Sequence, residues 1–188
     1  IDGEGTPVIH ITGVGELSPC SWDVIGDRIE AGTFLAACGM TRGNIVLENC
    51  APEHIKAVID KLKETGMEIS SEGSTIKASM SKKRPSAVDI RTVPYPGFPT
   101  DMQAQLMAAM TTSKGVSAIT ETIFENRMMH AAELRRMGAD IRVVGNTAIV
   151  HGVESISGAK VMATDLRASA SLIIAGLAAY GRTEVSRI

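Results

Sequence analysis

An internal repeat constrains the fold of this chain more than any other feature of its sequence. The tract GMEISSEGST, from Gly66 to Thr75, returns 72 residues later as GADIRVVGNT, from Gly138 to Thr147. Each copy follows a stretch with the spacing of an amphipathic helix, starts with a glycine and has another glycine seven residues on. Glycine commonly ends helices and opens tight turns between strands. The repeat therefore predicts several similar units along the chain.

The order of elements within a unit follows from the pattern around the repeat. A further helical stretch precedes each copy, so each unit is expected to contain strand, helix, strand, helix, strand and strand (βαβαββ). One unit is predicted from about 22 to 81, a second from about 87 to 153, and a third from about 160, cut off at 188 after strand, helix and strand. Residues 1–20 resemble the tail of a preceding repeat, which leaves 21–188 with two full units and a truncated third. We therefore expect the chain to be a piece of a longer one.

Helices and strands differ in which faces are apolar. The stretches after Asp101 (MQAQLMAAM) and Asp165 (LRASASLIIAGLAAY) are apolar or small nearly all round, as in helices surrounded by protein. The predicted strands alternate, with Val88, Ile90 and Val93 set against polar neighbours, which indicates one buried and one solvated sheet face. The fold class is therefore α/β, with the helices buried and the sheets outside. If the units are related by rotation, their helix N-termini gather at one end, where helix dipoles favour anionic ligands.

Charged residues are concentrated at that end. Three helices are expected to begin at an aspartate N-cap: Asp27, Asp101 and Asp165. Aspartate is among the best N-cap residues and stabilises a helix by about 1 kcal/mol, so capping alone can explain each of them. Three arginines are predicted in first helical turns: Arg28, Arg127 (after a predicted cap at Asn126) and Arg167. Because a cation there opposes the dipole by roughly 0.3–1 kcal/mol, these arginines indicate either side chains turned into water or a site that holds an anion.

Composition argues against several classes of partner. Lys and Arg number 19 against 21 Asp and Glu, and a net charge of −2 argues against nucleic-acid binding and an anionic-membrane surface. The basic run at 82–85 is interpreted as a solvated connector between units. The longest apolar run, around 172–180, is about half the length of a bilayer span. The chain has three cysteines, Cys20, Cys38 and Cys50, and they lack CxxC spacing. This favours reduced thiols in a cytoplasmic protein over disulfides or a zinc site.

Two shorter patterns are rejected as sites. The segment 13–15 (Gly-Val-Gly) follows a strand-like run as a dinucleotide-binding loop would, but the third glycine and the acidic residue are misplaced. His130 and Glu133 lie one helical turn apart without forming a ligand cluster with the other histidines, so no metal site is predicted. The other histidines are His10, His54 and His151.

Four tracts carry a resemblance to a known family: DRIEAGTF from Asp27, FPTDMQAQ from Phe98, ITETIFENRMMHAAEL from Ile119 and GAKVMATDLRASASL from Gly158. They resemble the enolpyruvyl transferase family, in the branch that acts on UDP-N-acetylglucosamine, and the resemblance runs along all 188 residues. It implies a two-lobed inside-out α/β barrel, each lobe built from three βαβαββ units. Residues 1–20 would be the last hairpin of the partner lobe and 21–188 most of the C-terminal lobe. The missing N-terminal lobe is therefore an implied partner.

The resemblance also implies an activity. Such enzymes move the enolpyruvyl group of phosphoenolpyruvate to the 3-hydroxyl of UDP-N-acetylglucosamine and release phosphate, the first committed step of peptidoglycan synthesis, with no cofactor. Asp101 matches the general base that takes the hydroxyl proton and also binds that hydroxyl. Arg127 matches an arginine that clamps phosphoenolpyruvate. The loop Ile123, Phe124 and Glu125 matches a sugar-nucleotide contact.

Further positions are implied at the boundary between the lobes. Asp165 and Arg167 match active-site residues there, with Asp165 paired to a lysine of the other lobe, and Asp27 and Glu30 match positions near the sugar nucleotide. The proton-donating cysteine of the family has no match here, so the chain alone is expected to be inactive. Two alternatives stay open: a sugar-nucleotide-binding module without catalysis, and the sister enzyme that makes 5-enolpyruvylshikimate 3-phosphate, to which the tract FENRMMH is foreign.

Overall fold

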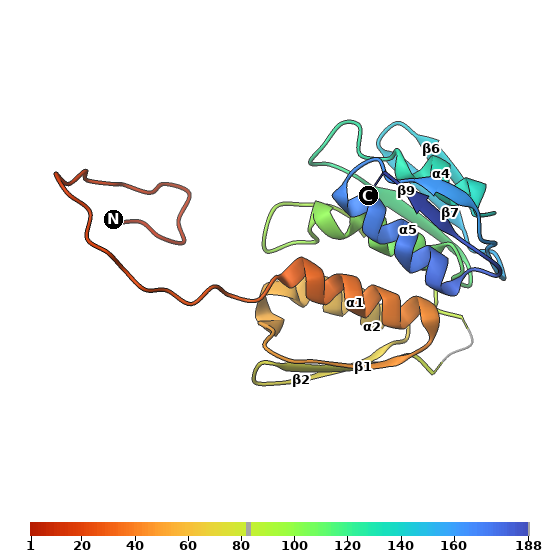
Figure 1. Ribbon diagram of the computed structural model, residues 1–188, viewed down its shortest axis with the longest axis horizontal. Helices are drawn as coiled ribbons and strands as arrows, with labels where there is room; N and C mark the ends of the chain where they lie inside the picture. Colours follow the sequence, from red (N-terminus) through yellow and green to blue (C-terminus); the bar gives the residue numbers. More distant parts are fainter. Residues whose placement is uncertain (82–83, 188) are drawn as a thin grey trace.

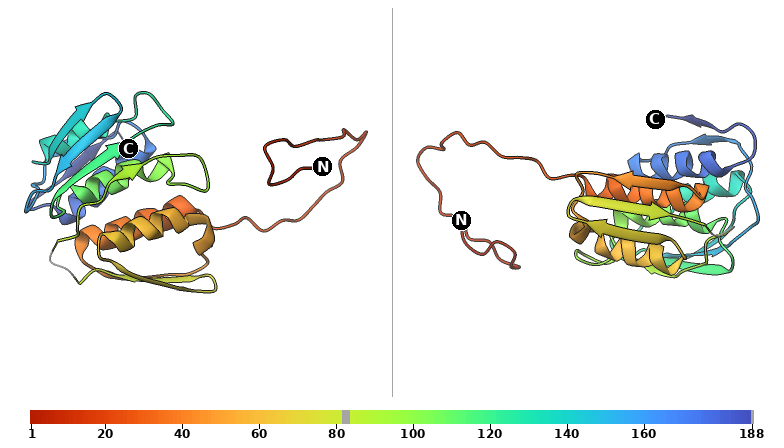
Figure 2. Two further views of the ribbon diagram at one scale, coloured as in Figure 1. Left: turned by 180° about the vertical axis from the view of Figure 1, so that it is seen from behind. Right: turned by 90° about the horizontal axis from the view of Figure 1, so that it is seen from below.

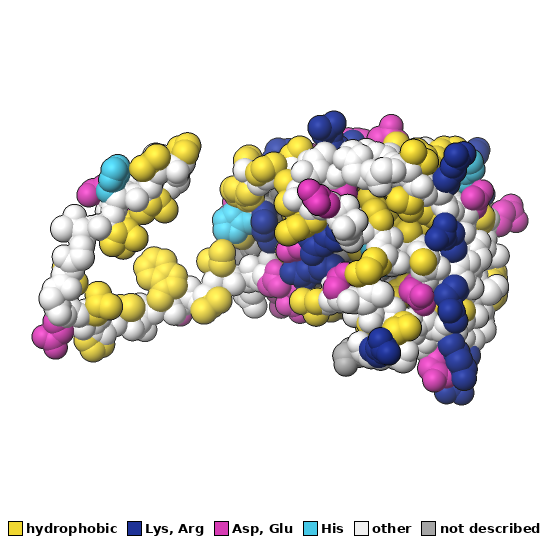
Figure 3. Space-filling model, turned by 90° about the horizontal axis from the view of Figure 1, so that it is seen from above, with side chains coloured by type: hydrophobic (Ala, Val, Ile, Leu, Met, Phe, Trp, Pro, Cys, Tyr) yellow, Lys and Arg dark blue, Asp and Glu magenta, His cyan; other side chains and the backbone are white. Residues whose placement is uncertain are grey.

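A computed structural model describes residues 1–81 and 84–187. From residue 28 onward the chain forms a body of helices and sheets, and the residues before it extend away from that body (Figure 1). Within this extended segment, Asp2 and His10 pair through two backbone hydrogen bonds of 3.0 and 2.9 Å. Hydrophobic side chains lie exposed along the segment (Figure 3). None of the helices in the described ranges is long and apolar enough to cross a membrane.

The first sheet is antiparallel and has the order β1-β3-β2. Its strands are β1 (Asn44–Leu47), β2 (Glu68–Glu72) and β3 (Thr75–Ser79). The helical elements beside it are α1 (Arg28–Thr41), η1 (Pro52–Ile55) and α2 (Lys56–Glu64). Helix α1 ends where Arg42 adopts a left-handed conformation with φ of 58° and the backbone N–H of the next residue, Gly43, bonds the carbonyl of Cys38 at 3.0 Å.

The second sheet has the order β4-β5-β7-β6, with β4 parallel to β5 and the other pairs antiparallel. Its strands are β4 (Ile90–Arg91), β5 (Val116–Thr120), β6 (Asp140–Val144) and β7 (Thr147–His151). The helical elements are η2 (Thr100–Met102), α3 (Gln103–Met110) and α4 (His130–Arg136). Chain order here is strand, helix, strand, helix, strand, strand, as the repeat predicted.

The third group comprises β8 (Lys160–Met162), α5 (Leu166–Ala178) and β9 (Glu184–Ser186), with β8 parallel to β9. The repeat appears in the backbone of the first two groups, because Gly73 and Gly145 turn β2 into β3 and β6 into β7 with φ of 56° and 58°. Gly66 and Gly138 follow α2 and α4 with φ of 98° and 92°. A left-handed conformation at these places is what glycine allows most easily.

Helices α1, α3 and α5 pack against one another within the body (Figure 2), whereas α2 and α4 each keep one exposed face. All eight residues of α3 are buried, which confirms the prediction for the stretch after Asp101. Helix α5 was expected to be buried all round, but it is buried on one side only. On its other side Leu166, Ile173 and Leu177 are 74, 46 and 65% exposed. Over residues 1–81 and 84–187 the three sheets do not close into a barrel.

The first unit differs from its prediction, because no strand precedes α1. Trp22 and Val24 are 86 and 93% exposed, and β1 pairs only with β3 in the described part of the chain. The corresponding strand of the second unit, β4, lies parallel to β5 and is buried at Ile90. The apolar pattern near Trp22 therefore has no partner here that would bury it.

Two finer predictions also need correction. In the segment before α3 the inward-facing residues are Ile90 and Thr92, and Thr92 is 0% exposed. Val93, which was expected to be buried, is 36% exposed. Thr92 faces inward because its hydroxyl donates to the buried Glu121. In the basic run 82–85, Lys82 and Lys83 lie outside the described residues. Arg84 is not solvated as expected: it is half-buried and donates to the carbonyls of Thr112, Ser113, Gly152 and Val153.

Candidate active site

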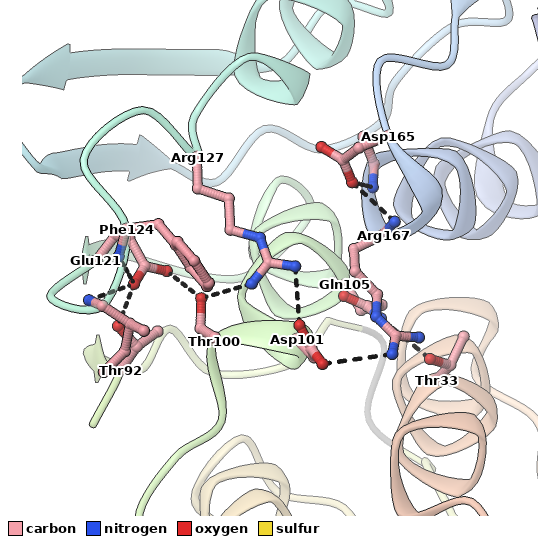
Figure 4. A network of polar contacts seen from close by, with 12 residues as sticks. Thr33, Thr92, Thr100, Asp101, Gln105, Glu121, Phe124, Arg127, Asp165 and Arg167 are labelled. Atoms are coloured by element: carbon pink, nitrogen blue, oxygen red, sulfur yellow. Dashed lines mark hydrogen bonds and ion pairs between the residues drawn. The ribbon is translucent and has the colours of Figure 1, made fainter. Parts of the chain in front are cut away.

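The N-terminal halves of the three inner helices meet at one end of the body. Gln105 of α3 donates from Nε2 to Oγ1 of Thr33 in α1 over 3.1 Å, and Asp101 in η2 contacts Arg167 in the first turn of α5. This confirms the expectation that helix N-termini gather at one place. Figure 4 shows the network of polar side chains found there.

Asp101 is held at the start of α3 by its neighbours in the chain. Phe98 and Met102 on either side of it are 6 and 0% exposed, so they anchor the short η2 turn in the core. The loop before η2 is closed by a backbone hydrogen bond of 3.0 Å from Val93 to Phe98. Asp101 itself keeps a side chain that is 38% exposed. The carboxylate is therefore fixed in place yet accessible.

Two arginines hold the carboxylate of Asp101. Arg127 donates from Nη2 to Oδ1 over 2.8 Å, and Arg167 donates from Nη2 to Oδ2 over 3.4 Å (Figure 4). Asp101 is not an N-cap as predicted, because it lies inside the η2 turn and Pro99 occupies the cap position. Within the described part of the chain its oxygens have no backbone partner, and they engage the arginines instead.

The other two aspartates cap their helices as predicted. Asp27 accepts from the backbone N–H of Ile29 and Glu30 at 2.7 and 3.3 Å. Asp165 accepts from the backbone N–H of Arg167 and Ala168 at 2.8 and 2.9 Å. Both carboxylates therefore stabilise a helix start, whatever else they contact.

One of the three arginines does not lie where it was predicted. Arg127 precedes α4, which begins only at His130, so Asn126 is not a helix cap. Besides Asp101, Arg127 contacts Oγ1 of Thr100 at 2.9 Å and lies over the ring of Phe124 at 4.9 Å. Arg167 does lie in the first turn of its helix.

Arg28 also lies in the first turn of its helix, but its contacts are with other residues than Asp101. It lies over the ring of Tyr95 at 4.9 Å and donates to the carbonyl of His54 at 3.4 Å. The structure therefore brings together Arg127 and Arg167 around Asp101, whereas the contacts of Arg28 are with Tyr95 and His54.

A buried glutamate lies behind Asp101 and the following loop. Glu121 is 2% exposed, and its Oε1 accepts from Thr92 Oγ1 (2.8 Å) and from the N–H of Ile123 and Phe124 (2.7 and 3.2 Å). Its Oε2 accepts from Thr100 Oγ1 at 2.7 Å. Burial raises the pKa of this carboxyl, but the four hydrogen bonds outweigh burial and hold the pKa below its usual value. Glu121 is therefore ionised at neutral pH.

Sequence reasoning did not assign Glu121 or Thr100 to the site. One signal was available, because Glu121 shares the inward parity of β5 with Ile119, which is 0% exposed. A charged residue at an inward strand position is rare unless it is paired or hydrogen-bonded. Its partner Thr100 lies 21 residues away, which strand periodicity does not reveal.

The loop predicted to bind a ligand lies beside this network. Ile123 and Phe124 are 38 and 53% exposed, and Glu125 is exposed as well. Their backbone is fixed from behind by Glu121, and Arg127 links the loop to Asp101. The structure therefore places the predicted loop and the predicted base around one accessible surface.

The remaining predicted residues, Asp27 and Glu30, line a separate pocket. It is also lined by Phe34, Leu47 and Cys50. Within the described ranges, no hydrogen bond or ion pair joins these two residues to Asp101. The predicted site residues therefore divide into two groups.

His130 is a neutral residue close to the network. It is 2% exposed, and burial lowers its pKa to about 4, with Asp165 acting to raise the pKa and Arg127 to lower it further. Within the ranges that the structure describes, no three His, Cys, Asp or Glu side chains are grouped as a metal site would require. The chemistry available here is that of carboxylates and arginines: proton transfer and anion binding.

Solved structures share this fold. The enolpyruvyl transferase NikO from Streptomyces tendae matches with a TM-score of 0.75 at 26% identity, over 87% of this chain and 39% of that one. An EPSP synthase from Acinetobacter baumannii matches with a TM-score of 0.68 at 19% identity, over 87% and 39%, which shows the fold alone. The α/β fold of this chain is therefore that of the enolpyruvyl transferases.

Sequence comparison then specifies the family. The EPSP synthase (3-phosphoshikimate 1-carboxyvinyltransferase) family matches residues 1–188, and this chain belongs to that family. UDP-N-acetylglucosamine 1-carboxyvinyltransferases from Desulfosudis oleivorans and Geobacter metallireducens are 54% and 56% identical to it over 188 residues. The chain spans 45% of the length of each of these relatives. The resemblance inferred from the four tracts is thereby confirmed.

Proposed function

We propose that the chain is part of a two-lobed transferase that moves the enolpyruvyl group of phosphoenolpyruvate to the 3-hydroxyl of UDP-N-acetylglucosamine. The observation that carries the proposal is the accessible carboxylate of Asp101, held between Arg127 and Arg167 at the start of the inner helices. The substrate class comes from the names of relatives at 54% and 56% identity. A role in the first committed step of peptidoglycan synthesis and a cytoplasmic location belong to the same proposal.

Asp101 is proposed as the general base. A sugar hydroxyl is far too weak an acid to ionise beforehand, so a carboxylate takes its proton as the oxygen bonds to C2 of phosphoenolpyruvate. In the same addition the C2–C3 double bond opens and C3 takes a proton from an acid that this chain lacks. In the later step C3 loses a proton, the double bond re-forms, and the bond from C2 to the phosphate oxygen breaks as phosphate leaves. Among the three aspartates near helix starts, Asp101 is the one that does not cap its helix, which leaves its oxygens available for this work.

The two arginines are proposed to change partners when phosphoenolpyruvate binds. Its carboxylate and phosphate both suit the planar fork of a guanidinium, and they compete with Asp101 for Arg127 and Arg167. Each arginine that turns to phosphoenolpyruvate releases an oxygen of Asp101, which can then accept the hydroxyl proton. Binding of one substrate would in this way activate the base for the other.

The remaining predicted residues are assigned to the sugar nucleotide and to the lobe boundary. The exposed loop of Ile123, Phe124 and Glu125 is proposed to contact UDP-N-acetylglucosamine through its backbone. Asp165 is proposed to face a lysine of the other lobe, and the pocket with Asp27 and Glu30 to lie near the sugar nucleotide. Asp165 suits such a contact because it is exposed and caps α5 through Oδ1, so that Oδ2 can accept from a lysine.

A second lobe is part of the proposal. The chain spans 45% of its relatives, so more than half of such a protein lies outside it. The fold proposed for each lobe is the inside-out barrel of three βαβαββ units, in which residues 1–20 belong with the partner lobe and 21–188 hold two full units and a truncated third. The exposed Trp22 segment and the exposed face of α5 are the places where such neighbours would pack.

The experiment is phosphate release by the full-length protein. We expect release from phosphoenolpyruvate that depends on UDP-N-acetylglucosamine and is absent when shikimate 3-phosphate replaces it. Release with shikimate 3-phosphate alone would assign the chain to the sister enzyme. Tight binding of UDP-N-acetylglucosamine with no phosphate release would leave only a binding module.

A further inference from the structure

Glu121 connects two parts of the candidate site that are separate in sequence. One oxygen, Oε1, accepts from the backbone N–H groups of Ile123 and Phe124, which belong to the exposed loop. The other oxygen, Oε2, accepts from the hydroxyl of Thr100, which precedes Asp101 in the η2 turn. A single buried carboxylate therefore lies between the loop and the base (Figure 4).

The hydrogen bond to Thr100 has a direction that matters for Arg127. A threonine hydroxyl has one proton to donate and lone pairs to accept with. Because a carboxylate accepts only, the proton of Thr100 points at Glu121, and a lone pair faces Nη1 of Arg127 at 2.9 Å. The charge on Glu121 thus fixes Thr100 as an acceptor for the guanidinium.

Arg127 in turn is orientated by two acceptors on neighbouring residues. Its Nη1 bonds Thr100 and its Nη2 bonds Asp101 at 2.8 Å, so the two contacts set the plane of the guanidinium. Loss of the Thr100 lone pair would leave the guanidinium held only by its bond to Asp101 and its contact with the ring of Phe124, so its plane would be less firmly set. A fork that binds two oxygens depends on that plane being set.

From these contacts we propose that Glu121 is a positioning residue for both substrates: it fixes the Ile123–Phe124 backbone on one side and, through Thr100, the plane of Arg127 on the other. This inference rests on the proposed function, which assigns the loop to the sugar nucleotide and Arg127 to phosphoenolpyruvate. Glu121 touches neither substrate. Its effect is exerted entirely through backbone N–H groups and one hydroxyl.

The two sides can be separated by substitution in the full-length protein. Thr100→Val removes the hydroxyl and leaves the hydrogen bonds that Glu121 accepts from the loop. KM for phosphoenolpyruvate should therefore rise about tenfold or more, while KM for UDP-N-acetylglucosamine stays within about twofold. Thr100→Ser keeps a hydroxyl and should restore both values. Glu121→Gln removes the charge and puts an N–H donor in place of one of the two acceptor oxygens. One side then loses its acceptor and the other keeps a weaker, neutral one, so both KM values should rise.

Thr111→Val is the matched control. Thr111 is 0% exposed, and its hydroxyl donates to the carbonyl of Ala108 at 2.7 Å at the other end of α3. This variant also loses a buried hydroxyl bond, so its melting temperature should fall about as much as that of Thr100→Val. Its KM values should match the wild type. A purely structural role for Thr100 would make the two variants kinetically alike.

The outcomes separate the inference from the function on which it rests. Wild-type turnover combined with unchanged KM values in Thr100→Val and Glu121→Gln would overturn the inference and leave the proposed function standing. A wild type that releases no phosphate from the two substrates would overturn both. If Glu121→Gln fails to fold, the comparison of Thr100→Val with Thr100→Ser still decides the Arg127 side, and equal KM values in that pair would refute it.

Discussion

Arg127 and Asp101 form an ion pair across 2.8 Å although 26 residues separate them along the chain. Asp101 lies in the η2 turn before α3, and Arg127 lies in the loop before α4. Residues in turns can face each other across the space between two helix starts, which is where a substrate anion would compete for the arginine.

Asp101→Asn tests the proposed base in the full-length protein. Asparagine keeps the size and hydrogen-bonding reach of the side chain but cannot take a proton, so turnover should fall by roughly 10²–10⁴-fold. Affinity for UDP-N-acetylglucosamine, measured by calorimetric titration, should stay within about tenfold, since one lost hydrogen bond changes it by no more than that. Asp60→Asn, on the exposed face of α2, is the control and should leave both quantities unchanged. Near-normal turnover of Asp101→Asn would assign the proton to another group.

Arg127→Lys tests the arginine clamp. Lysine keeps the charge but has no planar fork, so it can satisfy Thr100 or Asp101 but not both in the present geometry. Affinity for phosphoenolpyruvate should fall far more than affinity for UDP-N-acetylglucosamine. Arg136→Lys, at a side chain that is 61% exposed, serves as the control. An equal loss of both affinities would point to damage of the fold rather than of the clamp.

The repeat allowed much of the fold to be predicted because its signals are local. Gly73 and Gly145 turn between strands in a left-handed conformation that favours glycine, and that preference is visible in the sequence. Burial of α3 was equally visible, since a helix without a polar face has nowhere else to lie. The strand expected near Trp22 did not appear, because strand formation also needs a partner edge, which the segment itself does not encode.

The site was less predictable because its contacts are not local. Whether an aspartate caps a helix depends on the backbone just before it: Asp27 and Asp165 have the extended conformation of a cap, but Asp101 lies inside a turn after Pro99. Glu121 could be recognised as inward-facing but not as a partner of Thr100. The pairing of Asp101 with Arg167 spans 66 residues and follows only from the packing of α3 against α5.

His130 gives the stability of the protein a specific pH dependence. Burial lowers its pKa to about 4 from 6.5, so the folded state keeps the imidazole neutral while the unfolded state binds a proton below pH 6.5. Stability is therefore full above pH 6.5 and falls as the pH drops towards 4, by an amount on the order of 3 kcal/mol. The charged groups that act on His130 are Asp165 and Arg127.

The measurement is urea unfolding of the full-length protein between pH 7 and pH 4.5. His130→Gln, which cannot titrate, should lose the His130 part of the slope, so its stability should approach that of the wild type as the pH falls. Glu121 also makes the protein less stable in acid, but only at lower pH. Its pKa in the folded state lies below the ordinary value of 4.5, so the stability that its ionised form contributes is lost only as the pH falls below 4.5. Parallel stability curves for the wild type and His130→Gln would show that His130 does not titrate differently in the two states.

The last prediction concerns the 188-residue chain by itself: it should fold at least in part, and it should not catalyse. The buried contacts among α1, α3 and α5 give it a core of its own, with Leu35, Leu106 and Leu172 all 0% exposed. Catalysis by the proposed mechanism needs groups on both walls of a closing cleft, and this chain contributes Asp101 and two arginines on one wall.

Circular dichroism and phosphate release test the two halves of that prediction on one purified sample. We expect a cooperative thermal transition, no turnover, and weak binding of UDP-N-acetylglucosamine, at about millimolar Kd. The exposed Leu166, Ile173 and Leu177 of α5 should favour self-association, which sedimentation velocity would detect. A sample free of host enzyme that still releases phosphate from both substrates would refute the requirement for a second wall, because every catalytic group would then have to lie within these residues.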